Sequence, residues 1–124
     1  MAVRIFRCKK CGQMVFMLNK TGCDIHCCGE AMVELKAGEV DAAVEKHVPV
    51  YEVKDGIVNV TVGSVIHPMT EAHYIQYIVV ETKNNVMVKE LKYTDEPKAS
   101  FRLLDSDEVV SVYEYCNLHG LWKK

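Results

Sequence analysis

The sequence has no long apolar run and no concentration of charge of one sign. No stretch stays apolar over the roughly 20 residues of a membrane span, and no signal-peptide pattern follows the early basic residues. Lysines and arginines are scattered and the formal net charge is −2, so no basic stripe is available to neutralise phosphates. We therefore expect a cytoplasmic protein that binds neither membrane nor nucleic acid.

The sequence also shows no internal repeat and no convincing helix. Its composition is not typical of a disordered chain. The chain has 124 residues, enough for one good core and a small appendage but not for a second large domain. Hydrophobic residues make up 49% and charged residues 26%, which is ordinary for a folded globular protein.

Cysteine, in contrast, is abundant and unevenly placed. Residues 1–36 contain five of the six cysteines, whereas the remainder contains four of the five histidines. Cytoplasmic cysteines stay reduced, and a Cys-x2-Cys pair then indicates metal binding more than a disulfide. The segment 1–36 is too short to be stable on a hydrophobic core alone. We predict a small metal-ribbon domain over 1–36 and a second domain over 37–124, with 37–44 as the connector.

The second domain is predicted to be mainly β, because short runs of β-branched and aromatic residues alternate with turn residues. Asp55-Gly56 marks one tight hairpin, and Asn84-Asn85 marks another in which the asparagines can adopt positive φ. The predicted hairpins pair 48–54 with 57–62, 73–82 with 86–91, and 99–104 with 109–115. About seven strands in this pattern indicate an immunoglobulin-like antiparallel β-sandwich.

Four cysteines of the N-terminal segment form a first candidate metal site. Four thiolates satisfy one tetrahedral ion, and both zinc and iron accept them. The adjacent pair favours iron, since zinc ribbons usually carry two Cys-x2-Cys knuckles. Cys23 is interpreted as a spare thiol, and His26 is left outside the site. The four ligands are Cys8, Cys11, Cys27 and Cys28.

A second candidate site combines four histidines and the last cysteine. Each falls at a strand end or in a loop, and a sandwich gathers its loops at two ends, so distant ligands can converge. Any one of them could serve packing alone, but together they indicate a metal. Five ligands are one too many for tetrahedral zinc and one short of an octahedron, so an open position remains, which suits iron. The ligands are His47, His67, His73, Cys116 and His119.

Five segments of the chain carry a family resemblance in their order and spacing. They are Cys8-x2-Cys11 with Cys27-Cys28, Glu45-Lys-His-Val-Pro49, Gly63-Ser-Val-Ile-His-Pro-Met69, Glu71-Ala-His-Tyr74, and Tyr115-Cys-Asn-Leu-His-Gly-Leu-Trp122. Over essentially its whole length the chain resembles the desulfoferrodoxins, the two-iron class of superoxide reductase.

The resemblance implies two irons per chain and a division of labour between them. An Fe(Cys)4 centre would lie in a desulforedoxin-like N-terminal domain, and a catalytic Fe(His)4Cys centre in an immunoglobulin-like β domain. The histidines would be equatorial and Cys116 axial. The substrate would be superoxide, reduced by one electron to hydrogen peroxide. The resemblance also implies a homodimer and an external electron donor, a rubredoxin-like protein or its reductase.

Two neighbours of His47 are candidate catalytic residues. Lys46 carries a positive charge that would concentrate superoxide and order water beside the forming peroxide. Glu45 is a candidate to close onto the vacant position of the oxidised ion. From the residues alone, a solvated loop pair explains both equally well. The resemblance favours a function for both.

Two other classes of function remain open at this level. A blue-copper electron carrier also uses a β-sandwich with a C-terminal cysteine and histidine, but its site needs only two histidines and a weak axial ligand. A binding protein with two structural zinc ions is the other alternative. Colour and redox activity would exclude the zinc protein, because zinc is spectroscopically silent and does not change oxidation state.

Overall fold

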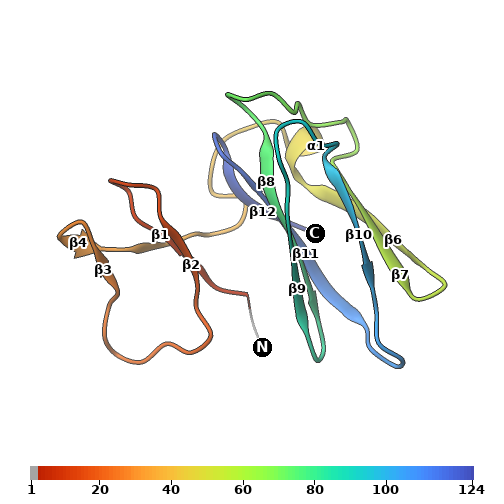
Figure 1. Ribbon diagram of the computed structural model, residues 1–124, viewed down its shortest axis with the longest axis horizontal. Helices are drawn as coiled ribbons and strands as arrows, with labels where there is room; N and C mark the ends of the chain where they lie inside the picture. Colours follow the sequence, from red (N-terminus) through yellow and green to blue (C-terminus); the bar gives the residue numbers. More distant parts are fainter. Residues whose placement is uncertain (1–2) are drawn as a thin grey trace.

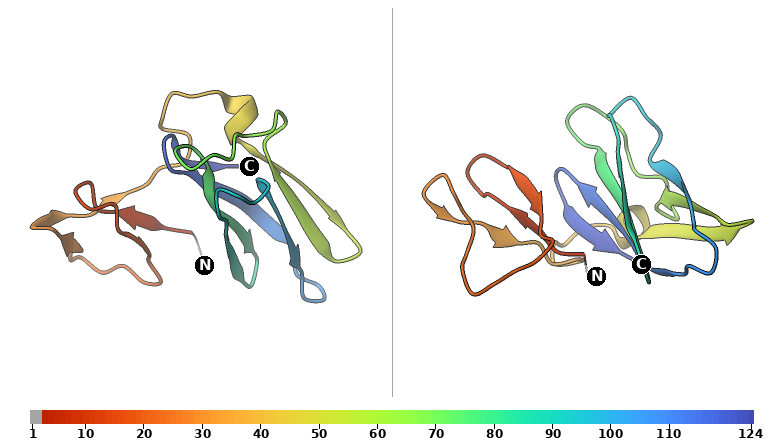
Figure 2. Two further views of the ribbon diagram at one scale, coloured as in Figure 1. Left: turned by 45° about the horizontal axis from the view of Figure 1, so that its top comes forward. Right: turned by 60° about the horizontal axis from the view of Figure 1, so that its bottom comes forward.

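The computed structural model describes residues 3–124, which form two β-rich parts side by side, joined by a connector (Figures 1 and 2). In the N-terminal part, β1, β2 and β5 form a three-stranded sheet in the order β2-β1-β5, and β3 and β4 form a separate hairpin. These strands are β1 (Ile5–Arg7), β2 (Met14–Phe16), β3 (His26–Cys27), β4 (Glu30–Ala31) and β5 (Val33–Glu34).

The second part is a sandwich of two antiparallel sheets, ordered β10-β7-β6 and β12-β11-β8-β9. Its seven strands confirm the predicted sandwich, and all of their pairings are antiparallel. The elements are α1 (Val44–His47), β6 (Pro49–Lys54), β7 (Ile57–Val62), β8 (Ile75–Thr82), β9 (Val86–Glu90), β10 (Lys98–Arg102), β11 (Val109–Cys116) and β12 (Gly120–Lys123).

The main core lies between these two sheets. Valines at alternate positions of β7 are fully buried, as the period of two along a strand requires. They pack against aliphatic residues of β8 and β11, and Cys116 closes one end of this cluster. Cys116 is therefore held within the main core of the sandwich. The β7 valines are Val58, Val60 and Val62.

The two predicted hairpin turns have different outcomes. Asp55 and Gly56 both have positive φ, 53° and 74°, which confirms the expected tight turn between β6 and β7. The expectation of positive φ at Asn84 and Asn85 is wrong, because neither is among the described residues with positive φ. That turn is instead held by the Thr82 hydroxyl, which accepts a hydrogen bond from the Asn85 amide at 2.8 Å.

The predicted pairing of the last hairpin is wrong. Strand β10 pairs with β7, whereas β11 pairs with β8 and β12, so the connection between β10 and β11 crosses from one sheet to the other. Packing explains the choice, because Ala99 and Phe101 of β10 lie against the core that β7 lines. A short loop between two strands is compatible with either arrangement, and burial decides between them.

Two short elements were not expected from the sequence. The four-residue helix α1 contradicts the absence of helices, and it ends at His47 itself. Strand β12 follows His119 and returns along β11, through a turn in which Gly120 has φ of 80°. Both elements flank histidines of the second site, so they fix where these side chains point.

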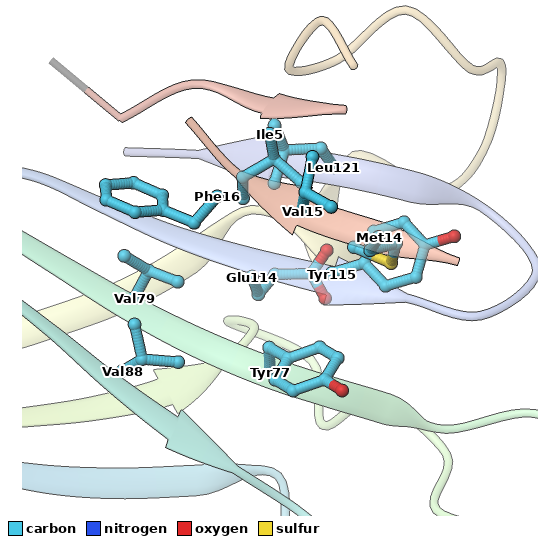
Figure 3. Close-up of a pocket in the computed structure, with 10 residues that line it drawn as sticks. All are labelled: Ile5, Met14, Val15, Phe16, Tyr77, Val79, Val88, Glu114, Tyr115 and Leu121. Carbon is cyan, nitrogen blue, oxygen red and sulfur yellow. The ribbon is translucent and has the colours of Figure 1, made fainter. Parts of the chain in front are cut away.

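The N-terminal part packs against the outer face of the β12-β11-β8-β9 sheet. Ile5 of β1 is buried with Tyr113 and Tyr115 of β11, and the Gly38 amide donates to the Leu121 carbonyl at 2.8 Å. A pocket of about 200 Å³ remains at this junction (Figure 3). It is lined by Ile5, Met14, Val15, Phe16, Tyr77, Val79, Val88, Glu114, Tyr115 and Leu121.

Among the described residues, no helix has the length and apolar character needed to span a membrane.

Candidate metal centres

Four imidazole rings form a closed square at one end of the sandwich. Neighbouring rings, taken in the order His47, His67, His73 and His119, have centroids 4.7 to 5.0 Å apart and lie nearly perpendicular, at 81° to 86°. The rings of His47 and His73 face each other across the square, with centroids 6.4 Å apart and planes at 27°. Such an arrangement turns one nitrogen of each ring toward a common centre.

Backbone carbonyls select which nitrogen points inward in two of these rings. The Nδ1 of His47 lies 2.8 Å from the Ala43 carbonyl oxygen, and the Nδ1 of His67 lies 2.7 Å from that of Pro68. Because a carbonyl only accepts, each Nδ1 carries the proton and each Nε2 keeps a free lone pair. These two lone-pair nitrogens nevertheless lie 3.2 Å apart. Two unprotonated nitrogens repel at that distance, so a cation between them fits.

The other donors complete this inward-facing set, called here the histidine–cysteine site. His119 Nδ1 lies 3.0 Å from His47 Nε2, and Cys116 Sγ lies 4.0 Å from His119 Nδ1. His73 Nε2 is buried and has no hydrogen-bond partner in the described residues. One donor atom from each of the five residues lies within 4.8 Å of all the others. The unsatisfied nitrogen of His73 is explained by a metal ion that takes its lone pair.

Burial favours the neutral, metal-binding form of three of these histidines. Loss of hydration lowers the pKa of His47 and His73, and it lowers the pKa of His67 to about 4. Burial likewise raises the pKa of the Cys116 thiol, an effect that the amides of Leu118 and His119 partly offset. A metal cation at the centre would reverse that shift and bind Cys116 as thiolate.

Trp122 supports the square from the side and was not expected as a site residue. Its indole Nε1 donates to the His119 carbonyl at 2.9 Å, and its ring lies 5.1 Å from that of His47. As the chain's single tryptophan, three residues beyond His119, it was a detectable signal.

Glu45 and Lys46 lie on α1, in the two positions before His47. Both side chains are exposed, and the charge of Lys46 contributes to the lowered pKa of His47 and of His73 after the larger effect of burial. The Glu45 carbonyl accepts a hydrogen bond from the Val65 amide at 2.9 Å, so the loop after β7 holds this segment in place.

Four N-terminal cysteines form a second cluster, the four-cysteine site, with the geometry of a tetrahedral centre. Cys11 Sγ lies 3.6 Å from Cys27 Sγ, which lies 3.9 Å from Cys28 Sγ. A tetrahedron with metal–sulfur bonds of about 2.3 Å has sulfur–sulfur edges of about 3.8 Å. The spacing therefore fits an ion bound by Cys8, Cys11, Cys27 and Cys28.

The ionisation of these thiols is unequal without a cation. Hydrogen bonds from the Cys11 and Lys10 amides lower the pKa of Cys8 to about 6. The neighbouring sulfur of Cys11 raises the pKa of Cys27 to about 12. Four thiolates at this separation thus need a metal ion to coexist. Cys23 is exposed and lies outside the cluster, as does His26, in agreement with the sequence.

Known proteins share both the sequence and the fold. Residues 39–124 match the family model described as desulfoferrodoxin. A desulfoferrodoxin from Nitratidesulfovibrio vulgaris is 47% identical over 119 residues, which cover 96% of this chain and 93% of that protein. Another from Syntrophotalea carbinolica is 44% identical, covering 97% and 94% of the two chains.

The chain belongs to the desulfoferrodoxin family. The crystal structure of a superoxide reductase from Treponema pallidum has a TM-score of 0.85 and 38% identity to it, covering 100% of this chain and 99% of that one. The four-cysteine and histidine–cysteine donor sets match the two iron centres of the desulfoferrodoxins.

A shorter relative aligns with only part of the chain. The one-iron superoxide reductase from Giardia intestinalis has a TM-score of 0.56 and 35% identity, and it covers 64% of this chain but 95% of its own. About a third of this chain therefore has no counterpart in that one-iron reductase.

Proposed function

We propose that this desulfoferrodoxin is a superoxide reductase, which reduces superoxide by one electron to hydrogen peroxide at an iron held by four histidines and Cys116. The observation that carries the proposal is the square of imidazoles with Cys116 completing the set, because five donors leave a six-coordinate ion one position for substrate.

When bound, ferrous iron supplies the electron and the open coordination position. Each superoxide takes up one electron and two protons to become hydrogen peroxide, so the protein must attract an anion and allow protons to reach it. Neutral histidines and one thiolate leave a ferrous site with a net charge near +1, which attracts superoxide. Zinc at the same donors cannot supply the electron.

Lys46 is proposed to bring superoxide to this position. Lys46 directly precedes His47 and is exposed. Its charge lowers the pKa of His47 and of His73, the two histidines that face each other across the square. A cation at this point raises the local concentration of an anion and can hold water that donates protons. The role of Lys46 is therefore electrostatic and not that of a metal ligand.

Glu45 is proposed as the side chain that would hold a ferric ion at the position not taken by the five donors. Its backbone is fixed by the loop after β7, while its exposed side chain has no hydrogen bond or ion pair among the described residues. A carboxylate is a hard ligand and suits the ferric ion better than the ferrous ion.

We propose that residues 1–36 and 37–124 are separate domains with separate tasks. The small buried cluster around the four-cysteine site, made of Phe6, Cys8 and Met32, cannot stabilise the first domain alone. The alignment of a one-iron reductase with 64% of the chain supports a catalytic unit that functions without the four-cysteine domain. The iron of the four-cysteine site would then be an accessory electron site, and an external rubredoxin-like protein or its reductase would return the electrons.

We further propose a cytoplasmic homodimer. All six cysteines are free, which suits a reducing compartment, since an oxidising one favours disulfides. Sedimentation of the metal-loaded protein at twice the monomer mass of 14.1 kDa would support the dimer, and sedimentation at the monomer mass would contradict it.

Electron transfer without catalysis is the competing function, and the donor count argues against it. A blue-copper carrier uses two histidines, one cysteine and a weak axial ligand. Here four imidazole nitrogens converge with the thiolate.

Metal analysis with visible spectroscopy tests the proposal at the level of the cofactors. We expect two irons per chain and a thiolate-to-iron absorption band that bleaches on reduction. Zinc in both sites, with no visible absorption, would contradict a redox function.

A further inference from the structure

Charge is divided unevenly between the two parts of this protein. Residues 1–36 contain six lysines and arginines against three acidic residues, a formal net charge of +3. Residues 37–124 contain nine against fourteen, a net charge of −5. The molecule therefore presents a positive N-terminal end and a negative sandwich, which orients a charged partner during approach.

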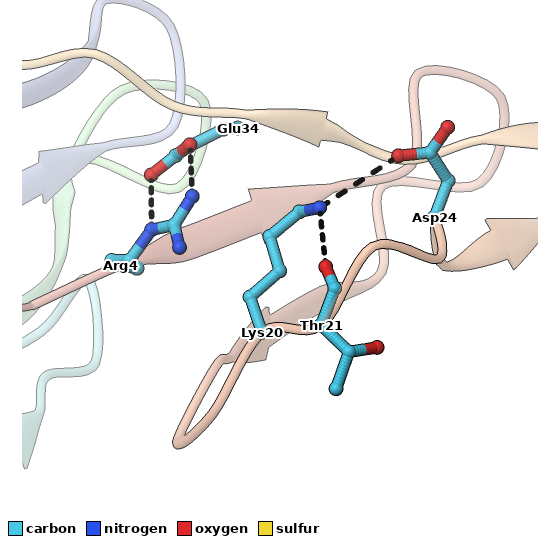
Figure 4. Close-up of polar contacts among 5 residues, drawn as sticks. All are labelled: Arg4, Lys20, Thr21, Asp24 and Glu34. Carbon is cyan, nitrogen blue, oxygen red and sulfur yellow. Dashed lines mark hydrogen bonds and ion pairs between the residues drawn. The ribbon is translucent and has the colours of Figure 1, made fainter.

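Ion pairs neutralise part of the N-terminal charge but leave one region free. Arg4 donates two hydrogen bonds to Glu34, at 2.8 and 2.9 Å, and the Lys20 ammonium lies 4.0 Å from Asp24 (Figure 4). Within residues 3–124, neither Lys9 nor Lys10 forms an ion pair. These two exposed lysines lie between Cys8 and Cys11, directly on the rim of the four-cysteine site.

The four-cysteine site is open on one side only. Cys8 is 2% exposed and packs in the small core of its domain, whereas Cys11 and Cys28 are exposed. Glycine follows each of the two exposed cysteines, and a Cβ added at Gly29 would meet no atom within 4 Å. A partner can therefore approach the backbone and the sulfurs closely here.

We propose that the knuckle face, defined as Lys9, Lys10, Cys11 and Cys28, docks an acidic one-electron carrier protein that reduces the iron of the four-cysteine site. This docking rests on the proposed function, because a superoxide reductase needs an external donor to return its electrons. One electron is transferred. The reduced carrier is oxidised, ferric iron at the cysteines is reduced to ferrous iron, and no bond is formed or broken and no proton is transferred.

Charge complementarity is the reason for committing to an acidic partner. The two lysines attract it, while the net charge of −5 on residues 37–124 disfavours encounters on the sandwich. Because two of the cysteine ligands are exposed, a partner docked on the lysines lies close to the metal site. A large interface is not needed for this. Weak, short-lived contacts of this kind are typical of electron-transfer encounters.

The test follows reduction of the cysteine-bound iron after mixing the oxidised, iron-loaded protein with a reduced rubredoxin of acidic net charge. In a double variant, Lys9→Glu with Lys10→Glu, we expect the second-order rate at low ionic strength to fall by at least about tenfold. The parent rate should fall as salt is added, and in the variant this dependence on salt should become weaker or change sign. Calorimetric titration with oxidised rubredoxin measures docking itself, and the variant should bind more weakly.

A matched control makes the same change of charge far from the knuckle face. Lys54 and Arg102 are exposed, and both lie opposite Ile57 at one end of the β10-β7-β6 sheet. The variant Lys54→Glu with Arg102→Glu should keep the parent rate within about twofold, because the steering is local. Lys9→Gln with Lys10→Gln, which removes charge without inverting it, should give an intermediate rate with the parent visible spectrum.

Two results would overturn the proposal: an unchanged rate and affinity in the Lys9 and Lys10 variants, or equal slowing by the control pair. Chemically reduced parent protein is mixed with superoxide in parallel, without any carrier. Absence of peroxide there would refute the proposed function, whatever the carrier rates are, so the two failures are distinguishable.

Discussion

The lone pairs of a few ring nitrogens determine what the histidine–cysteine site binds. His47 and His67 each donate Nδ1–H to a backbone carbonyl and so present Nε2 inward, while His73 Nε2 lies buried without a partner in the described residues. An empty site with this geometry concentrates unsatisfied lone pairs, which is costly for folding. A metal ion converts the same atoms into favourable contacts, so function and stability depend on the same cation.

Replacing Lys46 with isoleucine tests the proposed electrostatic role. We expect the second-order rate with superoxide to fall by about tenfold or more and to lose its dependence on ionic strength, since the attracting charge is gone. Both irons should remain bound. Pulse radiolysis measures the rate, with Lys54→Ile on the β6–β7 hairpin as the control. A rate equal to that of the parent protein would remove Lys46 from the mechanism.

Glu114 predicts a pH dependence of stability. Both of its carboxylate oxygens are buried without a hydrogen-bond partner in the described residues, and burial raises its pKa from 4.5 to about 9. The folded state therefore keeps a proton that the unfolded state releases. The stabilising contribution is complete below pH 4.5 and is lost as the pH rises toward 9.

The variant Glu114→Gln removes that titration and should be relatively more stable at alkaline pH. Denaturant unfolding of both proteins between about pH 6 and pH 9.5 measures the difference, which should widen as the pH rises. Parallel stability curves would show that Glu114 does not stay protonated on folding.

The sequence allowed the ligands to be predicted but not their supporting residues. Cysteine and histidine at characteristic spacings are rare enough to be recognised without a structure. Glu114 has no such signal, because a charged residue among the apolar residues of β11 looks like a solvent-facing position. Its burial follows from its register in β11, because Glu114 lies opposite Ile78 and alternates with Val112 on the face of the sheet that lines the main core.

At the scale of elements, the position of α1 depends on one close backbone contact. A Cβ at Gly63 would lie 2.7 Å from the Glu45 carbonyl oxygen and 2.8 Å from that of Val48. Only glycine leaves room for the loop after β7 to pass close to α1 and hold the segment that carries Lys46 and His47.

Gly63→Ala should therefore destabilise the protein by about 1–3 kcal/mol, because the added methyl forces α1 and the loop apart. The iron content of the histidine–cysteine site should fall with it. Gly22→Ala is the control, since a Cβ there meets nothing within 4 Å and its φ is not positive. Equal unfolding midpoints for both variants would contradict the proposed close contact.

Elements with a strong local signal were predictable, and those decided by packing were not. The Asp55-Gly56 hairpin formed as expected, because two adjacent positive φ values are encoded in the turn itself. The partner of β10, the short helix α1 and strand β12 depend on burial against distant residues, which local patterns do not contain.

At the scale of the whole molecule, the two parts have very different sources of stability. The sandwich has a continuous aliphatic core, whereas residues 3–36 contribute to a small cluster at the four-cysteine site and to a second one against the sandwich. Such a small unit needs its metal to stay folded.

Cys27→Ser should therefore release the iron of the four-cysteine site and increase amide hydrogen exchange across residues 3–36. Exchange within the sandwich strands and iron at the histidine–cysteine site should not change. Cys23→Ser is the control, because Cys23 is exposed and outside the cluster. Unchanged protection in residues 3–36 would contradict both the metal dependence and the proposed domain boundary.

The sequence predicted the composition of the two parts but not their contact. Cysteine content alone separated 1–36 from the rest, because a short segment rich in thiols cannot be stable without metal. That Ile5 packs on Tyr113 and Tyr115, at the outer face of a sandwich sheet, needed the structure, since the same apolar residues would also suit an interior position.

The central claim is reduction of superoxide, and one measurement tests it most directly. Chemically reduced, iron-loaded protein is mixed anaerobically with a known amount of superoxide while peroxide and dioxygen are both measured. We predict one peroxide for each superoxide consumed, oxidation of the iron at the histidine–cysteine site and no dioxygen. One dioxygen for every two superoxides would indicate dismutation and contradict this claim, as would superoxide decay at the rate seen without protein.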